Sequence, residues 1–401
     1  MESEASLRGP TALKLGVAYA ASGISGGMYI PFFGAWLVYK GMSTVEIGTL
    51  LSVGMLLRVI VPPLTGMIAD ARDDRRSMMI ALYGLQFLGY LGLNFVMTPV
   101  QIFLVAVTAS MAGSAASPLQ EGVSMRIAER LGFDYGRVRL WNSLTFTASN
   151  VLSGLAVTRW GLVVLAPWLA VSLALTFVSI CFVPAPPQGG PQGSLRVRIA
   201  ATFAETRELL KSTPFLLFLL AASLDQGSHA FYYGYGGLHW VRLGYSGALI
   251  GAIWPLGVIA EAMLFSVSLT LFRKIGPTRL LLLGGAGCVL RWTILAFDPN
   301  FALVVFAQIL HGATFALAHL GAMYFIVQAV PPRLSSTAQS LYAVGANGLA
   351  MGPATYLSGV LYPTLGGETY LVMAAMGLGA MLFAVLLGRV WHGGRITQQP
   401  T

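Results

Sequence analysis

The sequence predicts an all-α polytopic membrane protein, with twelve transmembrane helices arranged as two pseudo-symmetric six-helix halves. Hydrophobic residues make up 56% of the 401 residues and charged residues only 10%, with a mean hydropathy of +0.73. The apolar residues form about twelve segments, each long enough to cross a hydrocarbon core of roughly 30 Å. A single long polar loop separates the first six segments from the last six.

The predicted spans follow one another with short connections, so adjacent spans must be antiparallel neighbours. They are 13–38, 45–69, 77–97, 100–128, 137–158, 162–183, 214–241, 246–272, 280–297, 301–330, 335–361 and 367–390. The expected domains are an N-terminal half at 1–183, a linker at 184–213 and a C-terminal half at 214–401. We expect the two halves to surround a central cavity.

The distribution of Lys and Arg predicts the orientation of the chain. With the N-terminus in the cytoplasm, 19 of the 24 basic residues lie in the tails and even-numbered loops. The odd-numbered loops hold only Lys40, Arg159 and Arg242, and Arg58 and Arg291 lie inside spans. The positive-inside rule therefore places both termini in the cytoplasm.

The pI of the chain is high, near 9.7, because of basic residues beside the predicted membrane spans. The basic residues flank apolar spans, so anionic lipid headgroups are the better partner and no nucleic-acid partner is expected. The lipid bilayer is thus a predicted partner of this multi-pass chain.

The linker and the small residues predict further local features. The stretch PAPPQGGPQGS begins the linker and should be extended or flexible. The segment 195–212 has apolar residues at roughly helical spacing among charges, which predicts an amphipathic helix on the cytoplasmic surface. Gly23 and Gly27 form a small-xxx-small pair that permits close helix approach, and prolines recur within the spans. Ordinary bundle packing explains any one of these sites, whereas their number favours a bundle that bends.

Enzyme motifs are absent from the sequence. It contains no HExxH and no phosphate-binding glycine loop, and its GxSxG match, GISGG at 23–27, lies inside an apolar span and not on the strand-to-helix turn of a nucleophile elbow. Cys181 and Cys288 both fall in apolar spans, which argues against a disulfide framework. We therefore expect no enzyme activity, no metal and no cofactor.

Nine ionisable residues lie in or at the ends of the spans, where each costs roughly 2.5–3.5 kcal/mol in hydrocarbon unless it has a partner or a water-filled cavity. They are Arg58, Glu121, Arg139, Asp225, His229, Glu261, Arg291, His311 and His319. An apolar surrounding favours the protonated form of a carboxyl group, and an arginine beside it favours the ionised form. A carboxylate whose arginine partner comes and goes can therefore load and release a proton.

Helical spacing groups several polar residues. Asp225, His229 and Tyr233 stand at i, i+4 and i+8, so they are expected on one face of the seventh span. His311 and His319 are eight residues apart, within about 80° of each other around the tenth span. Structural histidines in a core are the alternative interpretation, but two on one apolar span near acids favour a functional role.

Several stretches together resemble a known family. FDYGRVRLWNS at 133–143, with Glu121 eighteen residues before Arg139, resembles the fourth-to-fifth span junction of the lactose permease branch of the major facilitator superfamily. Within that branch the chain is similar to bacterial permeases for 3-phenylpropionate. Further matching stretches are QGSHAFYYG at 226–234, GVIAEAMLF at 257–265, VLRW at 289–292 and QILHGATFALAHLGAMYF at 308–325.

The resemblance implies roles for five residues. Glu121 and Arg139 match the acid–arginine pair that binds sugar, and Glu261 matches a substrate-linked carboxylate. Arg291 matches the arginine that tunes the proton site, and His311 matches the histidine of the tenth span.

The chain departs from the family where the proton is expected to bind. Three residues after His311, where the lactose permease has its proton-accepting carboxylate, this chain has Thr314, which cannot titrate. By elimination we predict Glu261 as the main proton acceptor. Asp225 is the alternative, because His229 one turn away could hold it ionised. Arg291, His311 and His319 complete the predicted proton-coupling set.

Arg58 gives the main indication of the substrate. The phenylpropionate permeases share this arginine and the lactose permease lacks it, and a guanidinium in a water-filled cavity suits a carboxylate. The alternative is that Arg58 pairs with Asp70 or Glu121. Tyr232 and Tyr233, with His229, are expected to contact an aromatic ring of the substrate.

The predicted function is therefore proton-coupled symport of a small organic anion by alternating access. An aromatic monocarboxylate similar to 3-phenylpropionate is the expected substrate, and the protein is expected to act as a monomer in the bacterial inner membrane. The alternatives are a proton-coupled importer of sugars or nucleosides and an exporter of a drug-like compound. A sensor that binds without transporting is a third class.

Overall fold

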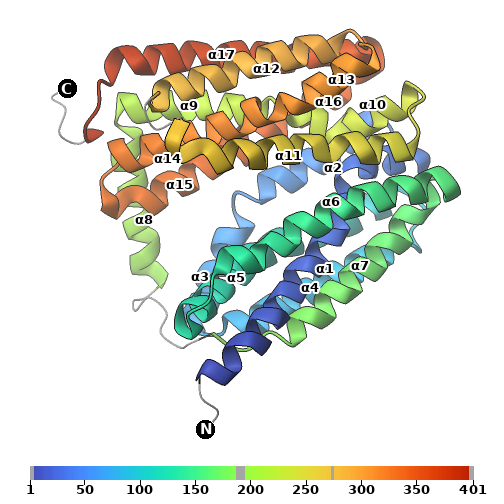
Figure 1. Ribbon diagram of the computed structural model, residues 1–401, viewed down its shortest axis with the longest axis horizontal. Coiled ribbons are helices and arrows are strands. Elements are labelled where there is room, and N and C mark those ends of the chain that lie inside the picture. The colour runs from blue at the N-terminus through green and yellow to red at the C-terminus, as the bar shows by residue number, and fades with distance from the viewer. Residues whose placement is uncertain (1–3, 187–194, 272–274, 397–401) are drawn as a thin grey trace. The chain divides into compact units, whose positions relative to one another are not determined.

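The computed structural model describes residues 4–186, 195–271 and 275–396, and side chains at 7–186, 199–266 and 275–396 (Figure 1). These residues form helices joined by short turns, and no strand occurs among them. Seven helices in this part of the chain are long and apolar enough to cross a membrane. They are Thr44–Ala71, Pro99–Leu131, Leu162–Cys181, Gly247–Ser266, Pro277–Ala296, Phe301–Ala329 and Pro332–Val390. The predicted all-α membrane fold is confirmed.

The chain divides into two compact units. Unit 1 comprises Met1–Leu195 and Trp240–Ala252, and unit 2 comprises Arg196–His239 and Ile253–Thr401. Unit 1 thus includes the end of the seventh predicted span and the start of the eighth. Close packing of Gly154 on Gly247 accounts for this grouping. A Cβ at residue 154 would lie only 2.4 Å from the carbonyl oxygen of Gly247.

Unit 1 consists of helices that match the first six predicted spans. They are α1 (Glu4–Tyr39), α2 (Thr44–Leu57), α3 (Val61–Ala71), α4 (Arg75–Gly92), α5 (Pro99–Leu131), α6 (Tyr135–Trp160), the short η1 (Leu162–Val164) and α7 (Leu165–Cys181). The predicted close approach at Gly23 and Gly27 is confirmed. A Cβ at Gly23 would lie 2.4 Å from the Asn142 carbonyl oxygen, and a Cβ at Gly27 would lie 2.8 Å from the Asn150 backbone nitrogen. Because these glycines lack a side chain, α1 packs directly on the α6 backbone.

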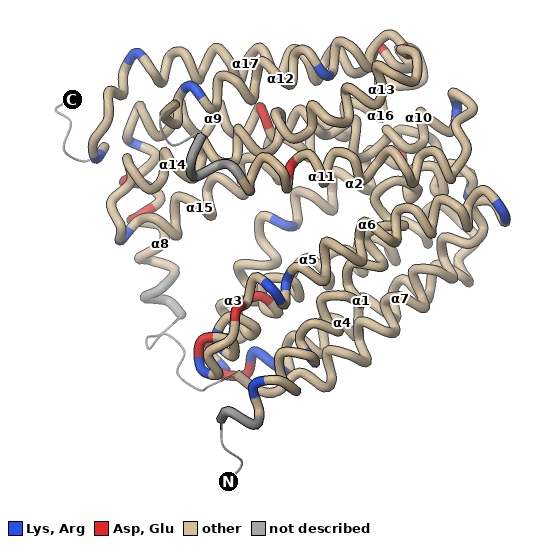
Figure 2. Tube along the Cα trace, viewed as in Figure 1, with Lys and Arg blue, Asp and Glu red and all other residues tan. Residues whose placement is uncertain are grey.

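Unit 2 takes in most of the second half of the chain. Its elements are α8 (Leu195–Leu210), α9 (Thr213–Gly227), η2 (Tyr232–Gly236), α10 (Gly237–Arg242), α11 (Gly247–Leu271), α12 (Pro277–Ala296), α13 (Phe301–Ile309), η3 (Gly312–Leu317), α14 (Ala318–Ala329), η4 (Pro332–Leu334), α15 (Ser335–Ala343), η5 (Val344–Ala350), α16 (Met351–Leu365), η6 (Gly366–Thr369) and α17 (Tyr370–Val390). Within α10 and α11, residues Trp240–Ala252 belong to unit 1. Charged residues are sparse along these helices and concentrate near their ends (Figure 2).

The helices are interrupted mainly by π-helical turns. The elements η2, η3 and η5 are π-helical, and all three lie in unit 2. Pro255, in contrast, lies within the continuous α11. α2 and α3 separate just before Pro62 and Pro63. A π-helical turn accommodates more residues than an α-helical turn, and such turns often mark functional sites.

The predicted amphipathic helix of the linker is α8, and it docks on the start of α15 within unit 2. Arg333 Nη1 donates to Glu208 Oε2 over 3.0 Å, and Thr337 donates a hydrogen bond to Glu205. Leu209 is buried in a core cluster while Phe203 is 72% exposed. Residues 187–194, which include most of the proline- and glycine-rich stretch, lie outside the described residues.

Candidate functional site

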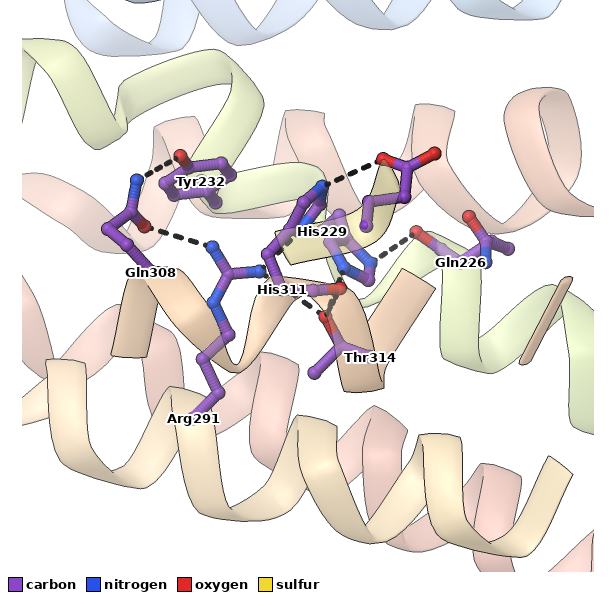
Figure 3. A network of polar contacts seen from close by, with 8 residues as sticks. Gln226, His229, Tyr232, Arg291, Gln308, His311 and Thr314 are labelled. Carbon is purple, nitrogen blue, oxygen red and sulfur yellow. Dashed lines mark hydrogen bonds and ion pairs between the residues drawn. The ribbon is translucent and has the colours of Figure 1, made fainter. Parts of the chain in front are cut away.

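A buried polar cluster in unit 2 has Arg291 of α12 at its centre (Figure 3). The Arg291 side chain is fully buried. Its Nη2 donates to Gln308 Oε1 over 3.0 Å, and its Nη1 donates to His311 Nδ1 over 2.8 Å and to Thr314 Oγ1 over 3.4 Å. Among the described residues, no carboxylate lies within ion-pair distance of the guanidinium. The cation is therefore held by neutral acceptors alone.

Aromatic rings enclose the same guanidinium. Arg291 Cζ lies 4.6 Å from the ring centroid of Tyr232 and 4.4 Å from that of Trp292. Trp254 stacks on Tyr232 with centroids 4.5 Å apart, and Tyr370 stacks on Trp292 at 5.5 Å. A cation over desolvated aromatic faces gains about 2 kcal/mol or more. These rings explain how an arginine without an acidic partner is accommodated inside the bundle.

Gln308 of α13 connects the guanidinium to its aromatic surroundings. Its Nε2 donates to the Tyr232 hydroxyl over 2.8 Å and to the Ile253 carbonyl oxygen over 3.2 Å. The sequence analysis did not select Gln308, although it precedes His311 by three residues and therefore lies near it on a helix. A neutral amide in an apolar span is a weaker signal than a charge.

His311 lies between Arg291 and Glu261. Arginine can only donate, so His311 Nδ1 must accept its hydrogen bond, and the neutral imidazole carries its hydrogen on Nε2. That Nε2 lies 3.9 Å from Oε2 of Glu261 on α11. The Glu261 side chain is 22% exposed, so the cluster reaches the surface of unit 2 there. The structure thus brings together three residues of the predicted proton-coupling set, whose role in coupling stays a prediction.

His229 is fully buried and follows the end of α9 at Gly227. Its Nδ1 lies 3.3 Å from the Asp225 carbonyl oxygen and 3.2 Å from that of Gln226, and its Nε2 lies 3.1 Å from Thr314 Oγ1. The Tyr233 ring stacks on the imidazole with centroids 5.8 Å apart. The predicted proximity of His229 and Tyr233 is confirmed.

The expected contact between the Asp225 carboxylate and His229 is not formed. His229 bonds the main chain of Asp225, while the carboxylate Oδ2 lies 3.6 Å from Cys288 Sγ on α12. The other carboxylate oxygen, Oδ1, is buried without a hydrogen-bond partner. The predicted contact was wrong because the carboxylate lies against α12, while both ring nitrogens of His229 have other partners.

His319 does not join the cluster. The π-helical η3 lies between His311 and His319, so the spacing expected for a regular α-helix does not apply. In the described part of the chain His319 makes no hydrogen bond or ion pair, and its ring contacts are with Phe315, Phe265 and Tyr342. Its predicted part in proton coupling has no contact to support it.

Unit 1 holds the predicted acid–arginine pair. Arg139 Nε of α6 lies 3.4 Å from Glu121 Oε1 of α5, which confirms that the two side chains pair. The side chains are 60% and 42% exposed, so the pair is not a buried one. Their part in binding substrate stays a prediction.

Arg58 follows the last residue of α2 and is exposed. Neither of its proposed acidic partners contacts it, because Asp70 pairs with Arg75 and Glu121 with Arg139. The pairing alternative for Arg58 was therefore wrong.

No group of three or more His, Cys, Asp or Glu that could hold a metal ion occurs among the residues that the structure describes.

Buried arginine, histidine and carboxyl groups in a bundle of apolar helices are typical of membrane transporters. The chain belongs to the MFS_1 like family, whose match covers residues 17–372. It is therefore a multi-pass inner-membrane protein that transports small molecules, and its family membership indicates a transporter instead of an enzyme.

Relatives and solved structures agree with this assignment. The chain is 30% identical to the probable 3-phenylpropionic acid transporter of Escherichia coli, over 92% of this chain and 95% of that protein. It is 26% identical to the maltose permease of Geobacillus stearothermophilus, over 90% and 91% of the two chains. Its fold matches the crystal structure of the nucleoside transporter NupG with a TM-score of 0.78 at 17% identity, over 97% and 100%. A D-xylose–proton symporter matches with a TM-score of 0.68 at 13% identity, over 98% of each chain.

Proposed function

We propose that this chain is a secondary active transporter that imports a small organic anion together with protons by alternating access. The observation that carries the proposal is the series of contacts from Glu261 through His311 to Arg291. It places a group that can bind a proton 3.9 Å from a histidine, which in turn contacts a cation without an acidic partner. Charges of this kind inside a span mark substrate and proton pathways.

An aromatic monocarboxylate similar to 3-phenylpropionate is the proposed substrate. Arg58 supports this choice, because its exposed guanidinium has no acidic partner within ion-pair distance among the described residues and suits a carboxylate in bidentate geometry. The relative at 30% identity carries the name of a 3-phenylpropionic acid transporter. Of the predicted aromatic contacts Tyr233 is partly exposed and offers its ring to the phenyl group, while Tyr232 and His229 pack against Tyr233 from the interior.

Within this proposal Glu261 is the main proton acceptor. It is the only carboxylate within 4 Å of a histidine of the cluster among the described residues, whereas Asp225 contacts Cys288. We further propose that the protein acts as a monomer. We also propose that both termini lie in the cytoplasm, as the distribution of basic residues indicates.

Proton-coupled import of a sugar or nucleoside is the second candidate. The paired and solvent-accessible Glu121 and Arg139 favour it, since together they offer donors and acceptors to hydroxyl groups. A maltose permease is also among the relatives. Export of a drug-like compound is a further alternative within transport.

Uptake into proteoliposomes tests the proposal. Purified protein is reconstituted, and an inward proton gradient is imposed in the presence of radiolabelled 3-phenylpropionate, maltose or uridine. Accumulation of 3-phenylpropionate alone, abolished by a protonophore, is the expected result. Accumulation of maltose or uridine instead would establish the second candidate, and binding without counterflow would indicate a sensor.

A further inference from the structure

We propose that His229 is a proton-carrying residue of the unit 2 cluster, and that the Thr314 hydroxyl is the positioning group that adapts to its two protonation states. This inference rests on the proposed proton-coupled function and adds a second proton site to Glu261. Its basis is the hydrogen bonding around one threonine oxygen (Figure 3).

The first step concerns His229 Nδ1. This atom faces two main-chain carbonyl oxygens, those of Asp225 at 3.3 Å and Gln226 at 3.2 Å. Carbonyl oxygens only accept, so Nδ1 must carry a hydrogen whether the ring is neutral or charged. The proton that distinguishes the two states therefore binds and leaves at Nε2.

The second step concerns Thr314 Oγ1, the partner of that Nε2 at 3.1 Å. A hydroxyl has one hydrogen and two lone pairs. Arg291 Nη1, at 3.4 Å, can only donate to this oxygen, and the His311 carbonyl oxygen, at 3.2 Å, can only accept from it. His229 Nε2 is the one neighbour that can do either.

The same positions of the heavy atoms therefore provide hydrogen-bond partners for both protonation states of His229. When Nε2 is bare, the Thr314 hydroxyl turns its hydrogen toward it. When a proton from solvent occupies the Nε2 lone pair, Nε2 donates to Oγ1 and the hydroxyl hydrogen turns to the His311 carbonyl oxygen. Only the hydroxyl rotates, so both His229 nitrogens and the Thr314 hydroxyl hydrogen have partners in either state.

The other histidines of this region lack such an arrangement. In His311 an added proton would have to bind Nδ1, which already accepts a hydrogen bond from Arg291 over 2.8 Å. Protonation of His311 would therefore break that hydrogen bond. His319 makes no hydrogen bond within the described residues. Of the three, His229 alone gains a proton without losing a contact.

The charges around His229 explain how proton and anion binding are linked. The titratable and charged groups beside it are Tyr233 from η2, Arg291 from α12 and His311 beside η3, while Asp225 of α9 presents its carbonyl oxygen and its carboxylate lies against Cys288 of α12. A second positive charge beside Arg291 is unfavourable by itself, and an anion that arrives at the cluster offsets it. The substrate carboxylate and the proton therefore bind together.

Two substitutions at Thr314 test the inference in proteoliposomes with radiolabelled 3-phenylpropionate. Thr314→Val keeps the shape and removes the hydroxyl, while Thr314→Ser keeps the hydroxyl. We expect Thr314→Val to lower proton-driven accumulation by about tenfold, because one protonation state loses its buried partner. Counterflow should remain within about twofold of the native rate, since exchange does not require the site to release its proton. Thr314→Ser should resemble the native protein in both measurements.

A threonine elsewhere in the chain provides a matched control. Thr176 of α7 is also fully buried, but its hydroxyl bonds only the Ser172 carbonyl oxygen of its own helix, so Thr176→Val should leave accumulation unchanged. Native accumulation by Thr314→Val, or equal loss in Thr314→Val and Thr314→Ser, would overturn the inference. If the native protein accumulates 3-phenylpropionate without a proton gradient, the proposed function fails instead.

Nitrogen-15 NMR of histidine-labelled protein examines the geometry without transport. The His229 signal, assigned by its loss in His229→Asn, should show a protonated Nδ1 and a bare Nε2 at high pH, and both nitrogens protonated at low pH. In Thr314→Val the pH midpoint at which this signal titrates should shift. A neutral His229 with its hydrogen on Nε2 would contradict the inference.

Discussion

Gln308 and Arg291, both fully buried, are joined by a hydrogen bond of 3.0 Å from the guanidinium Nη2 to the amide Oε1. Because Gln308 is neutral, it orients the guanidinium without cancelling its charge. The same amide donates to the Tyr232 hydroxyl, so one side chain sets the positions of the cation and of an aromatic ring over which it lies.

The neutrality of Gln308 can be tested directly. Gln308→Glu places a carboxylate against Arg291 and should weaken binding of 3-phenylpropionate by about tenfold, equivalent to roughly 1.4 kcal/mol. Competition binding to the detergent-solubilised protein measures this effect. Gln339→Glu, an exposed site on α15, is the control and should bind normally. Unchanged affinity in Gln308→Glu would show that the charge of Arg291 does not act on the substrate.

Glu261→Gln should separate exchange from accumulation. The amide cannot release a proton, so counterflow of 3-phenylpropionate should persist while proton-driven accumulation disappears. Both are measured in the same proteoliposomes. An unchanged dependence of accumulation on the proton gradient would exclude Glu261, and Asp225→Asn would then be examined.

The Glu121–Arg139 pair should contribute little to stability. Because the two side chains are 42% and 60% exposed, Glu121→Ala should change the free energy of unfolding by less than about 1 kcal/mol. If the pair binds substrate, transport should nevertheless fall, and the double variant with Arg139→Ala should transport no better than either single one. Thermal unfolding and uptake measure the two effects. Recovery of transport in the double variant would show that the residues matter only as mutual partners.

The contact between α1 and α6 predicts a large effect at Gly23. A Cβ there would lie 2.4 Å from a main-chain oxygen, so Gly23→Ala should force the helices apart and lower stability by about 1–3 kcal/mol. Gly9→Ala, in the same helix, meets nothing within 4 Å and should be neutral or stabilising. Thermal denaturation of both variants compares them, and equal melting temperatures would refute the packing argument.

The residues of the candidate site divide into those that sequence patterns reveal and those that they do not. Glu261, Arg291 and His311 were predicted because ionisable groups stand out in apolar spans and because they match a family pattern. Gln308 and Trp254 were not selected as members of the cluster, since neutral amides and single aromatic residues are common in spans. Their importance follows only from contacts with Arg291 and Tyr232.

The sequence by itself determined the membrane-spanning helices, the density of charge along them and the family, because apolar length and the cost of charge in hydrocarbon depend on local composition. Only the tertiary structure decided which groups meet. The π-helical η3 separates His319 from His311, and the Asp225 carboxylate lies against Cys288 of α12 instead of His229. Helical spacing assumes a regular 3.6-residue turn, whereas contacts between helices depend on interruptions and packing that distant segments impose.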